Sequence, residues 1–243
     1  MISFAFSDEQ EQLRKTLSDF AKKELLPHYT QWDRTKTFPY ELWKKMGKLG
    51  LTGMRVPSDY GGMGVDCVTT GIAAEEIGKG DFNAAYAVML NGLIGEILQA
   101  HATEAVKTTW LRSMAEGTCL LAIALTEPGA GSDAAKIQTR AVRRGDEYVI
   151  TGEKSGISLA KVAHGFLVFA KTDPEAGARG ISVFFVPRDS DGVEVQTYED
   201  MGNVPIGRGS VFFDRVRVPV EYRIGEENRG FYQVMNGFDL SRV

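Results

Sequence analysis

The sequence has few of the residues that build disulfides or metal centres. It contains 2 cysteines and 3 histidines among 243 residues. The cysteines, Cys67 and Cys119, form no CxxC pair, so no disulfide framework is indicated and a reducing compartment is expected. His101 lies close to Glu104, but no further ligand accompanies them, and a metal site needs more. We therefore expect no metal site.

Long hydrophobic runs and a strong charge of one sign are also missing. The longest apolar runs, 84–90 and 119–125, have seven residues each, whereas a membrane-spanning helix needs roughly 20. The net charge of −4 gives no sign of general binding to nucleic acid or anionic lipid. Acidic residues at positions 8, 9 and 11 are unlike a signal peptide. The expectation is a cytoplasmic protein that binds neither nucleic acid nor membrane.

Helical patterns fill the chain up to about residue 117. Ser7 and Gln10 have the spacing of a capping box, and the helix that they start is expected to end at Pro27. Asp66 and Asp81 are expected to cap helices near 66–79 and 81–100. The apolar spacing predicts two more helices, near 39–50 and 103–116.

From about residue 118 to residue 225 the pattern changes to short strands. They are predicted at 119–126, 137–143, 147–151, 154–159, 166–172, 181–187, 193–198 and 209–219. Gly, Asp and Pro between them are typical of an antiparallel sandwich or barrel. After Gly225 the pattern is helical again. This last apolar face either packs on the β-domain or needs a partner, because an unpartnered apolar face is costly.

A glycine-rich segment, LTEPGAGSD at residues 125–133, follows an apolar strand. It is not a Walker loop, because no Lys follows Gly131, and it is not a GxGxxG fingerprint. Successive backbone amides in such a turn can form an anion-binding concavity. The alternative is an ordinary turn in which Ser132 or Asp133 caps a short helix.

The same segment resembles the flavin-contacting signature of acyl-CoA dehydrogenases. Other segments resemble that family in the same order along the chain: GL at 50–51 with VPSDYGGMG at 56–64, DEYVITGEK at 146–154, FFDRVRVP at 212–219 and DLSR at 239–242. Because the similarity is ordered and covers essentially the whole chain, the sequence is identified as a member of this family.

The resemblance implies an α+β fold in three parts. An N-terminal all-α domain would occupy residues 1–117, an antiparallel β-barrel domain residues 118–228, and the beginning of a C-terminal helical bundle residues 229–243. The resemblance also implies an FAD-dependent enzyme that dehydrogenates the Cα–Cβ bond of an acyl-CoA by abstracting the α-proton and passing a hydride to flavin N5. A homotetramer and electron transfer to electron-transferring flavoprotein would accompany this activity.

The resemblance assigns two groups of binding residues. Those assigned to FAD are Ile123, Ala124, Leu125, Thr126, Glu127, Pro128, Gly129, Ala130, Gly131, Ser132, Gly156, Ile157 and Ser158. Those assigned to the acyl-CoA are Ser132, Asp239, Leu240, Ser241 and Arg242. Thr126 would hydrogen-bond the isoalloxazine edge, and Ser132 would lie near the flavin phosphate and the pantetheine arm.

One position departs from the family. Gly156 stands where these enzymes have Trp, followed by Ile157 and Ser158 as usual. Ser158 retains the hydroxyl for flavin, but Gly156 removes the indole that normally flanks it. This change puts in question the usual docking with electron-transferring flavoprotein. It leaves open an oxygen-reactive flavoprotein, an oxidase or monooxygenase, as an alternative function. A non-catalytic subunit that binds flavin or CoA is the third interpretation.

No catalytic base is assigned within the chain. In the family the base is a carboxylate of the C-terminal bundle, so we expect it beyond Val243 and expect residues 1–243 alone to be inactive. Glu127 is expected to order its turn, whereas Glu75 and Glu76 are expected to be ion-paired or solvated. Tyr86, with Leu90 and Leu93, either lines the acyl cavity or belongs to the core of a buried helix.

Overall fold

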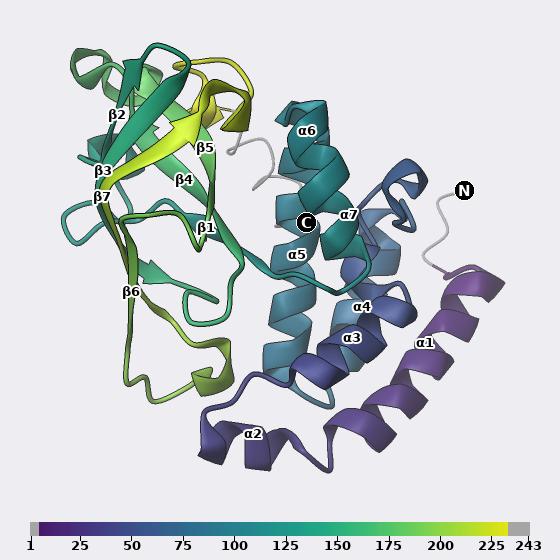
Figure 1. Cartoon of the computed structure of the whole chain (residues 1–243). Coiled ribbons are helices and arrows are strands. Elements are labelled where there is room, and N and C mark those ends of the chain that lie inside the picture. Colours follow the sequence, from purple (N-terminus) through teal and green to yellow (C-terminus); the bar gives the residue numbers. More distant parts are fainter. Residues whose placement is uncertain (1–4, 233–243) are drawn as a thin grey trace.

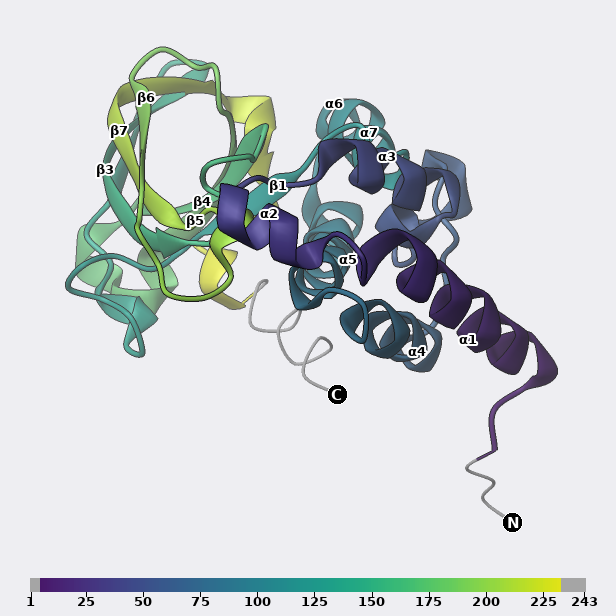
Figure 2. The ribbon, with the colours of Figure 1, turned by 90° about the horizontal axis from the view of Figure 1, so that it is seen from below.

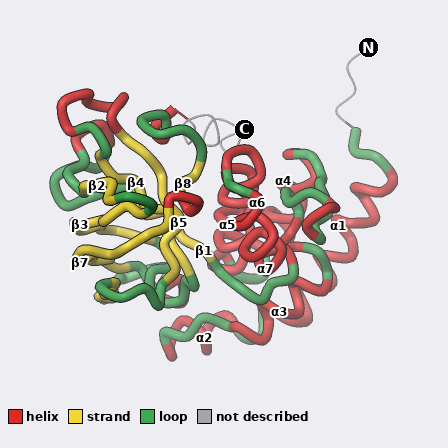
Figure 3. The backbone as a smooth tube through the Cα atoms, turned by 45° about the horizontal axis from the view of Figure 1, so that its top comes forward, coloured by secondary structure: helices red, strands yellow, loops and turns green. Residues whose placement is uncertain are grey.

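The computed structural model describes residues 5–232, and the first half of them is helical (Figures 1 and 3). The helices are α1 Asp8–Phe20, α2 Tyr29–Thr35, α3 Tyr40–Lys48, α4 Cys67–Gly78, α5 Phe82–His101, α6 Glu104–Val106 and α7 Arg112–Ala115. Two π-helical turns, Ala21–Leu25 and Lys107–Leu111, continue α1 and join α6 to α7. The predicted helix at 103–116 is therefore continuous but contains a π-turn.

The predicted helix starts are confirmed. Ser7 accepts a hydrogen bond from the backbone N–H of Gln10, and the Gln10 side chain accepts one from the backbone of Ser7. Asp66 caps α4 through the N–H of Thr69, and Asp81 caps α5 through the N–H of Asn83. These caps satisfy N–H groups that have no partner within their helix.

Helix α2 was not predicted from the sequence. It lies between Pro27 and Pro39, and none of its residues is buried. Because it has no buried face, it has no apolar period that could reveal it.

The second half of the chain forms eight strands. They are β1 Leu121–Ala124, β2 Arg140–Arg144, β3 Glu147–Ile157, β4 Gly165–Lys171, β5 Ile181–Pro187, β6 Val193–Thr197, β7 Gly209–Pro219 and β8 Arg223–Ile224. The prediction of two strands at 147–151 and 154–159 is wrong, because β3 is one strand. Its pairing with β7 shifts register between Ile150 and Gly152 and between Lys154 and Ile157. Such bulges interrupt the alternation that sequence patterns rely on.

The strands form one curved sheet (Figure 2). Its hydrogen-bonded order is β6-β7-β3-β2-β4-β5-β8, and β1 pairs with β4 outside this path. The helical-then-β architecture is confirmed, but the sheet does not close, so "barrel" describes only its curvature. The expected antiparallel arrangement has exceptions: β1 runs parallel to β4, and one residue pair joins β2 to β4 in parallel. No hairpin connects β1 to β4, so their connection does not require opposite directions.

Strand β4 lies in the interior of the sheet, between β2 and β5. All seven of its residues are buried, since β1, β2 and β5 pair with it along the sheet. Helix α5 packs against β1 (Figure 1). The strand that leads into the glycine-rich segment is therefore held between the central helix and the centre of the sheet.

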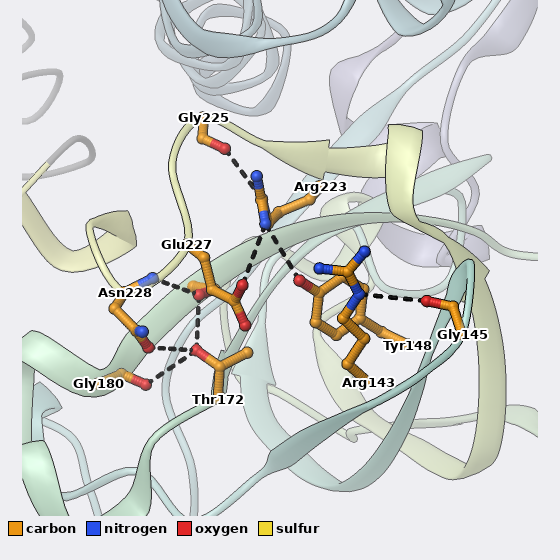
Figure 4. A network of polar contacts seen from close by, with 10 residues as sticks. Arg143, Gly145, Tyr148, Thr172, Gly180, Arg223, Gly225, Glu227 and Asn228 are labelled. Carbon is orange, nitrogen blue, oxygen red and sulfur yellow. Dashed lines mark hydrogen bonds and ion pairs between the residues drawn. The ribbon is translucent and has the colours of Figure 1, made fainter.

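A polar network fixes the segment that follows β8 (Figure 4). The Arg223 guanidinium donates to Tyr148 Oη at 3.1 Å and lies 3.3 Å from Glu227 Oε2. Farther along, the N–H of Asn228 donates to Ser182 Oγ at 2.7 Å. These bonds attach residues 223–228 to β3 and β5. Of the helical face predicted at positions 231, 234, 235 and 238, Phe231 packs against the core, and the other three positions lie outside the residues that the structure describes.

We predict that Gly165→Ala destabilises the fold by about 1–3 kcal/mol, the usual cost of overpacking. A Cβ at this position would lie 2.5 Å from the Phe185 ring, and the Trp110 ring, 4.6 Å away, restricts movement of Phe185. Denaturant unfolding measures the effect. Gly71→Ala in α4 is the control: it meets no atom within 4 Å and should stabilise by about 0.5–1 kcal/mol. Changes of the same sign in both variants would contradict this account.

Candidate functional site: the 125–133 loop and the end of β3

The 125–133 loop begins with a tight turn after β1. Glu127 and Ala130 exchange backbone hydrogen bonds of 3.1 and 3.0 Å, which leaves Pro128 and Gly129 exposed at its tip. Gly129 and Gly131 have no atom within 4 Å of where a Cβ would lie. Where Cβ atoms on Gly129 and Gly131 would project, the backbone of the loop is therefore not covered by other atoms.

Polar groups in the second half of the loop are available for a ligand. The backbone N–H groups of Gly131 and Ser132 and the Ser132 hydroxyl have no hydrogen-bond partner among residues 5–232. Asp133 forms an exposed ion pair with Lys136 at 3.0 Å. Neither Ser132 nor Asp133 caps the short 3-10 turn at Ala134–Lys136 through its side chain. Asp133 nevertheless occupies the N-cap position of this turn, and its carbonyl oxygen accepts the N–H of Lys136 at 3.0 Å. The loop is therefore compatible with both interpretations, an ordinary turn before a short helix and an anion-binding concavity.

A buried ion pair holds this loop to the sheet. Lys154, on β3, has a fully buried side chain, and its Nζ lies 2.8 Å from Glu127 Oε1 and 2.9 Å from the carbonyl oxygen of Leu125. The carboxylate of Glu127 also accepts the backbone N–H groups of Gln138 and Thr139, at 2.6 and 3.0 Å. A buried pair of charges is tolerated because each has several hydrogen-bond partners. Glu127 orders its turn, as the sequence suggested.

Burial shifts the pKa values of Lys154 and Glu127 in opposite directions. It lowers the pKa of Lys154 to about 8, although the neighbouring Glu127 favours the charged form. Burial also raises the pKa of Glu127, but hydrogen bonds from Lys154 and Thr139 outweigh it and bring this pKa below its usual value. At neutral pH both groups are therefore ionised, and protein donors occupy three of the roughly four lone-pair positions of the buried Glu127 carboxylate.

Thr126 connects the loop to the bulged end of β3. Its hydroxyl donates to the carbonyl oxygen of Ser155, and the N–H of Ser155 donates to the Thr126 carbonyl at 2.9 Å. The next residue, Gly156, is exposed, and a Cβ on it would lie 3.9 Å from Thr126 Oγ1. Thr126 and Gly156 therefore lie side by side, as the resemblance implied for two flavin contacts.

Gly156 has a left-handed backbone conformation, with φ of +67°. Its N–H donates to Tyr198 Oη at 3.2 Å, and Tyr198 Oη lies 2.8 Å from Ser210 Oγ. The Arg208 guanidinium lies 5.9 Å from the centre of the Tyr198 ring. The glycine at position 156 therefore has a structural role besides the absence of an indole. The bulge gives this position a left-handed conformation that residues other than Gly and Asn seldom adopt.

Ser158 is where the sheet domain meets the helical domain at this site. Its Oγ lies 2.9 Å from the hydroxyl of Tyr86 on α5. Ile157, one residue earlier, is buried in the core. The solvated-hydroxyl alternative for Ser158 is wrong, since its hydroxyl has a specific partner.

Tyr86 also lines a groove of about 570 Å³ between α4 and α5. The lining residues are Ala74, Glu75, Gly78, Lys79, Phe82, Ala85, Tyr86 and Met89. Phe82 is 60% and Met89 49% exposed, so the groove presents apolar surface. Of the other residues proposed for the acyl cavity, Leu93 is buried and Leu90 is partly buried against the core.

The remaining residues that the sequence assigned to the site differ in burial. Ala124, Leu125 and Ala130 are buried, and Ile123 is half-buried. The four residues from Asp239 to Arg242 lie outside the described part of the chain.

Neither of the two helical carboxylates considered in the sequence is free. Glu75 lies 3.0 Å from Lys79 Nζ, and the buried Glu76 lies 2.7 Å from the same atom. The sequence had suggested partnered acids here.

Three side chains at the site had no clear sequence signal: Lys154 as partner of Glu127, Tyr86 as partner of Ser158, and Tyr198 beside Gly156. Each pair is distant along the chain, so only folding brings its members together. Lys154 alone gave a hint, because it is a charged residue within a predicted strand.

Two kinds of feature are absent from residues 5–232. Among residues 5–232 no three His, Cys, Asp or Glu side chains gather as a metal ion would need. Over the same residues no helix combines the length and apolar character that crossing a bilayer requires.

Two family profiles match this chain in succession. The N-terminal domain of acyl-CoA dehydrogenases matches residues 7–118, and the middle domain matches residues 122–216. The chain belongs to the acyl-CoA dehydrogenase family.

Full-length relatives extend beyond this chain. The probable acyl-CoA dehydrogenase YngJ of Bacillus subtilis is 39% identical over 246 residues, covering 100% of this chain and 64% of YngJ. The crystal structure of acyl-CoA dehydrogenase from Geobacillus kaustophilus matches with a TM-score of 0.94 and 33% identity, over 99% of this chain and 64% of that one. The prolyl acyl carrier protein oxidase AnaB matches with a TM-score of 0.92 and 28% identity, over 98% and 64%. The chain thus spans 64% of the length of these proteins.

We predict that Gly156→Ala destabilises the protein by about 1–2 kcal/mol, the cost of a left-handed conformation for a residue with a Cβ. The effect is one of backbone strain, because the added Cβ would meet no atom closer than 3.9 Å. Gly156→Asn should lose less, since Asn tolerates this region. Denaturant unfolding ranks the three proteins. An alanine variant as stable as wild type would show that the backbone relaxes without cost.

We also predict that Lys154→Met destabilises the fold by about 3–5 kcal/mol, because it leaves the Glu127 carboxylate buried without its cation. Adding Glu127→Gln should recover part of this loss, since it removes the uncompensated charge. Lys136→Met, which breaks the exposed pair with Asp133 in the same loop, is the control and should have little effect. Equal losses in the two lysine variants, measured by chemical denaturation, would exclude a special role for the buried pair.

Proposed function

We propose that this chain supplies the FAD-binding and part of the acyl-binding surface of a flavin-dependent acyl-CoA dehydrogenase. The observation that carries the proposal is the 125–133 loop: an open backbone turn with unpartnered N–H groups, held in place by a buried ion pair, beside Thr126, Gly156 and Ser158. Membership of the family supports the same assignment. We place the domain boundaries at 117/118 and 228/229, and the catalytic base outside this chain.

The residues present are compatible with FAD. Gly129 and Gly131 leave room for close approach of a planar or phosphate-bearing group, and free N–H groups suit an anion. In this proposal Thr126, Ser132, Gly156 and Ser158 would hold the cofactor directly, while the buried Ile157, Ala124 and Leu125 and the half-buried Ile123 support them from the core.

The chemistry requires a hydride acceptor, which FAD supplies when bound, because no amino-acid side chain can do so. This chain binds and orients the reactants. The carboxylates of Glu76 and Glu127 are occupied by ion pairs and hydrogen bonds, so neither serves as the base that removes the α-proton. The apolar side chains of Phe82 and Met89 in the groove beside Tyr86 would contact an uncharged acyl group, next to the ion-paired Glu75 and Lys79.

FAD binding tests the proposal. Wild-type protein that contains the complete C-terminal domain should bind FAD in titration calorimetry, and Thr126→Ala should weaken binding by about 0.5–1.5 kcal/mol, the net contribution of one hydrogen bond. In the anaerobic protein containing the complete C-terminal domain, an acyl-CoA should bleach the flavin absorbance. Lys44→Met, which breaks an exposed ion pair with Glu41 on α3, is the control and should leave FAD binding unchanged. Absence of FAD binding by the wild-type protein would overturn the assignment.

An oxygen-reactive flavoprotein is the second candidate function. The exposed Gly156 leaves one side of the predicted flavin position without a side chain, and AnaB, an oxidase, has the same fold over this region. Reoxidation of the reduced flavin by oxygen in stopped flow separates the two: slow reoxidation supports the dehydrogenase, whereas rapid reoxidation supports the oxidase.

A further inference from the structure

A single hydrogen bond joins the central helix to the predicted flavin residues. Tyr86, on α5, and Ser158, just after β3, are 72 positions apart in the sequence, and their hydroxyl oxygens lie 2.9 Å apart. Within the described chain neither hydroxyl has another hydrogen-bond partner. The two groups therefore depend on each other for orientation.

We propose that Tyr86 is a positioning residue: its hydroxyl orients that of Ser158, so that the Ser158 proton points to the edge of the flavin. The inference rests on the proposed function, in which Ser158 contacts FAD, and extends the site to a residue of the helical domain.

The 2.9 Å separation of the two oxygens allows either hydroxyl to be the donor. We take Tyr86 as the donor and Ser158 as the acceptor, because a phenol is a stronger hydrogen-bond donor than an aliphatic alcohol. A hydroxyl has one proton and two lone pairs. With Tyr86 on one lone pair, the Ser158 proton stays free for a second acceptor. The reverse arrangement would use up that proton and leave Ser158 as an acceptor only.

The Tyr86 ring is held independently of its hydroxyl. It stacks on Phe82, with 6.3 Å between ring centres and an interplanar angle of 28°, and it packs against the main core. Asp81 fixes the start of the same helix. Removing only the hydroxyl, as in Tyr86→Phe, therefore keeps the packing and changes the hydrogen bond alone.

A double-mutant cycle on the FAD-loaded protein tests the inference. Tyr86→Phe, Ser158→Ala and the double variant are compared by flavin absorption spectrum, reduction potential and FAD dissociation constant. We expect Tyr86→Phe to shift the spectrum and potential and to weaken FAD binding roughly 3- to 10-fold, the effect of about one net hydrogen bond. In the Ser158→Ala background Tyr86→Phe should have no further effect, because the Ser158 hydroxyl that Tyr86 would orient is absent.

Two further variants sharpen the result. Ser158→Thr keeps the hydroxyl and should preserve the response to Tyr86→Phe. Tyr40→Phe removes a hydroxyl that donates to the Val162 carbonyl at 3.1 Å, elsewhere between the helices and the sheet, and should leave the flavin spectrum unchanged.

The outcomes separate this inference from the proposed function. If Tyr86→Phe binds FAD with an unaltered spectrum and potential, Tyr86 does not position Ser158 and the inference is wrong, while the proposed function stands. A shift that persists in the Ser158→Ala background overturns it as well, since Tyr86 would then act by another route. A wild-type protein that binds no FAD overturns the proposed function, and the inference with it.

Discussion

The buried pair between Lys154 and Glu127 is the interaction on which the candidate site depends. It joins three segments: the loop after β1 through the Leu125 carbonyl, the segment at 138–139 through its backbone N–H groups, and β3 through Lys154 itself. Each of these segments also contributes to the sheet or to the exposed loop. Two buried charges are a poor source of net stability, because desolvation offsets their attraction. The pair instead fixes the position of the loop, because a displacement that separates Glu127 from Lys154 would leave a buried charge unpaired.

The bulged end of β3 has the complementary role of placing short polar groups at the surface. A regular strand would alternate its side chains between the two faces. The register shift between Lys154 and Ile157 breaks this alternation, so that Lys154 and Ile157 are buried while Gly156, between them, is exposed. One strand can thereby supply both the buried cation that holds the loop and the exposed backbone beside Thr126.

The sequence revealed most of the architecture but little of this geometry. Helix starts at Ser7, Asp66 and Asp81 were predictable because capping is local, and the change from helices to strands near residue 118 followed from periodicity. Helix α2 was missed because it has no buried face. The sequence pattern predicts two strands where β3 is one, because bulges break its alternation. The parallel pairing of β1 with β4 was not predictable, because it depends on contacts between distant segments.

The candidate site was likewise predictable from the sequence only in part. The 125–133 loop was recognisable because its glycines and polar residues are consecutive. Of Lys154, Gly156 and Ser158, only the last two were assigned a role from the sequence, although all three lie close together at the end of β3 and just after it. Their partners Glu127, Tyr198 and Tyr86 lie 27, 42 and 72 positions away. Local propensity carries no information about such pairs.

The helical domain and the sheet meet at both ends of α5, which makes that helix part of the site. Near its start, Tyr86 contacts Ser158; at its other end, the His101 carbonyl accepts the N–H of Gly225 at 2.8 Å, just after β8. Arg223 holds the same segment to β3 through Tyr148. A displacement of α5 relative to the sheet would therefore disturb two hydrogen-bonded junctions at once. Because rigid elements transmit position better than loops do, the groove on α5 and the polar edge at Ser158 keep a fixed relation, as the proposed reaction between an acyl group and a bound flavin would require.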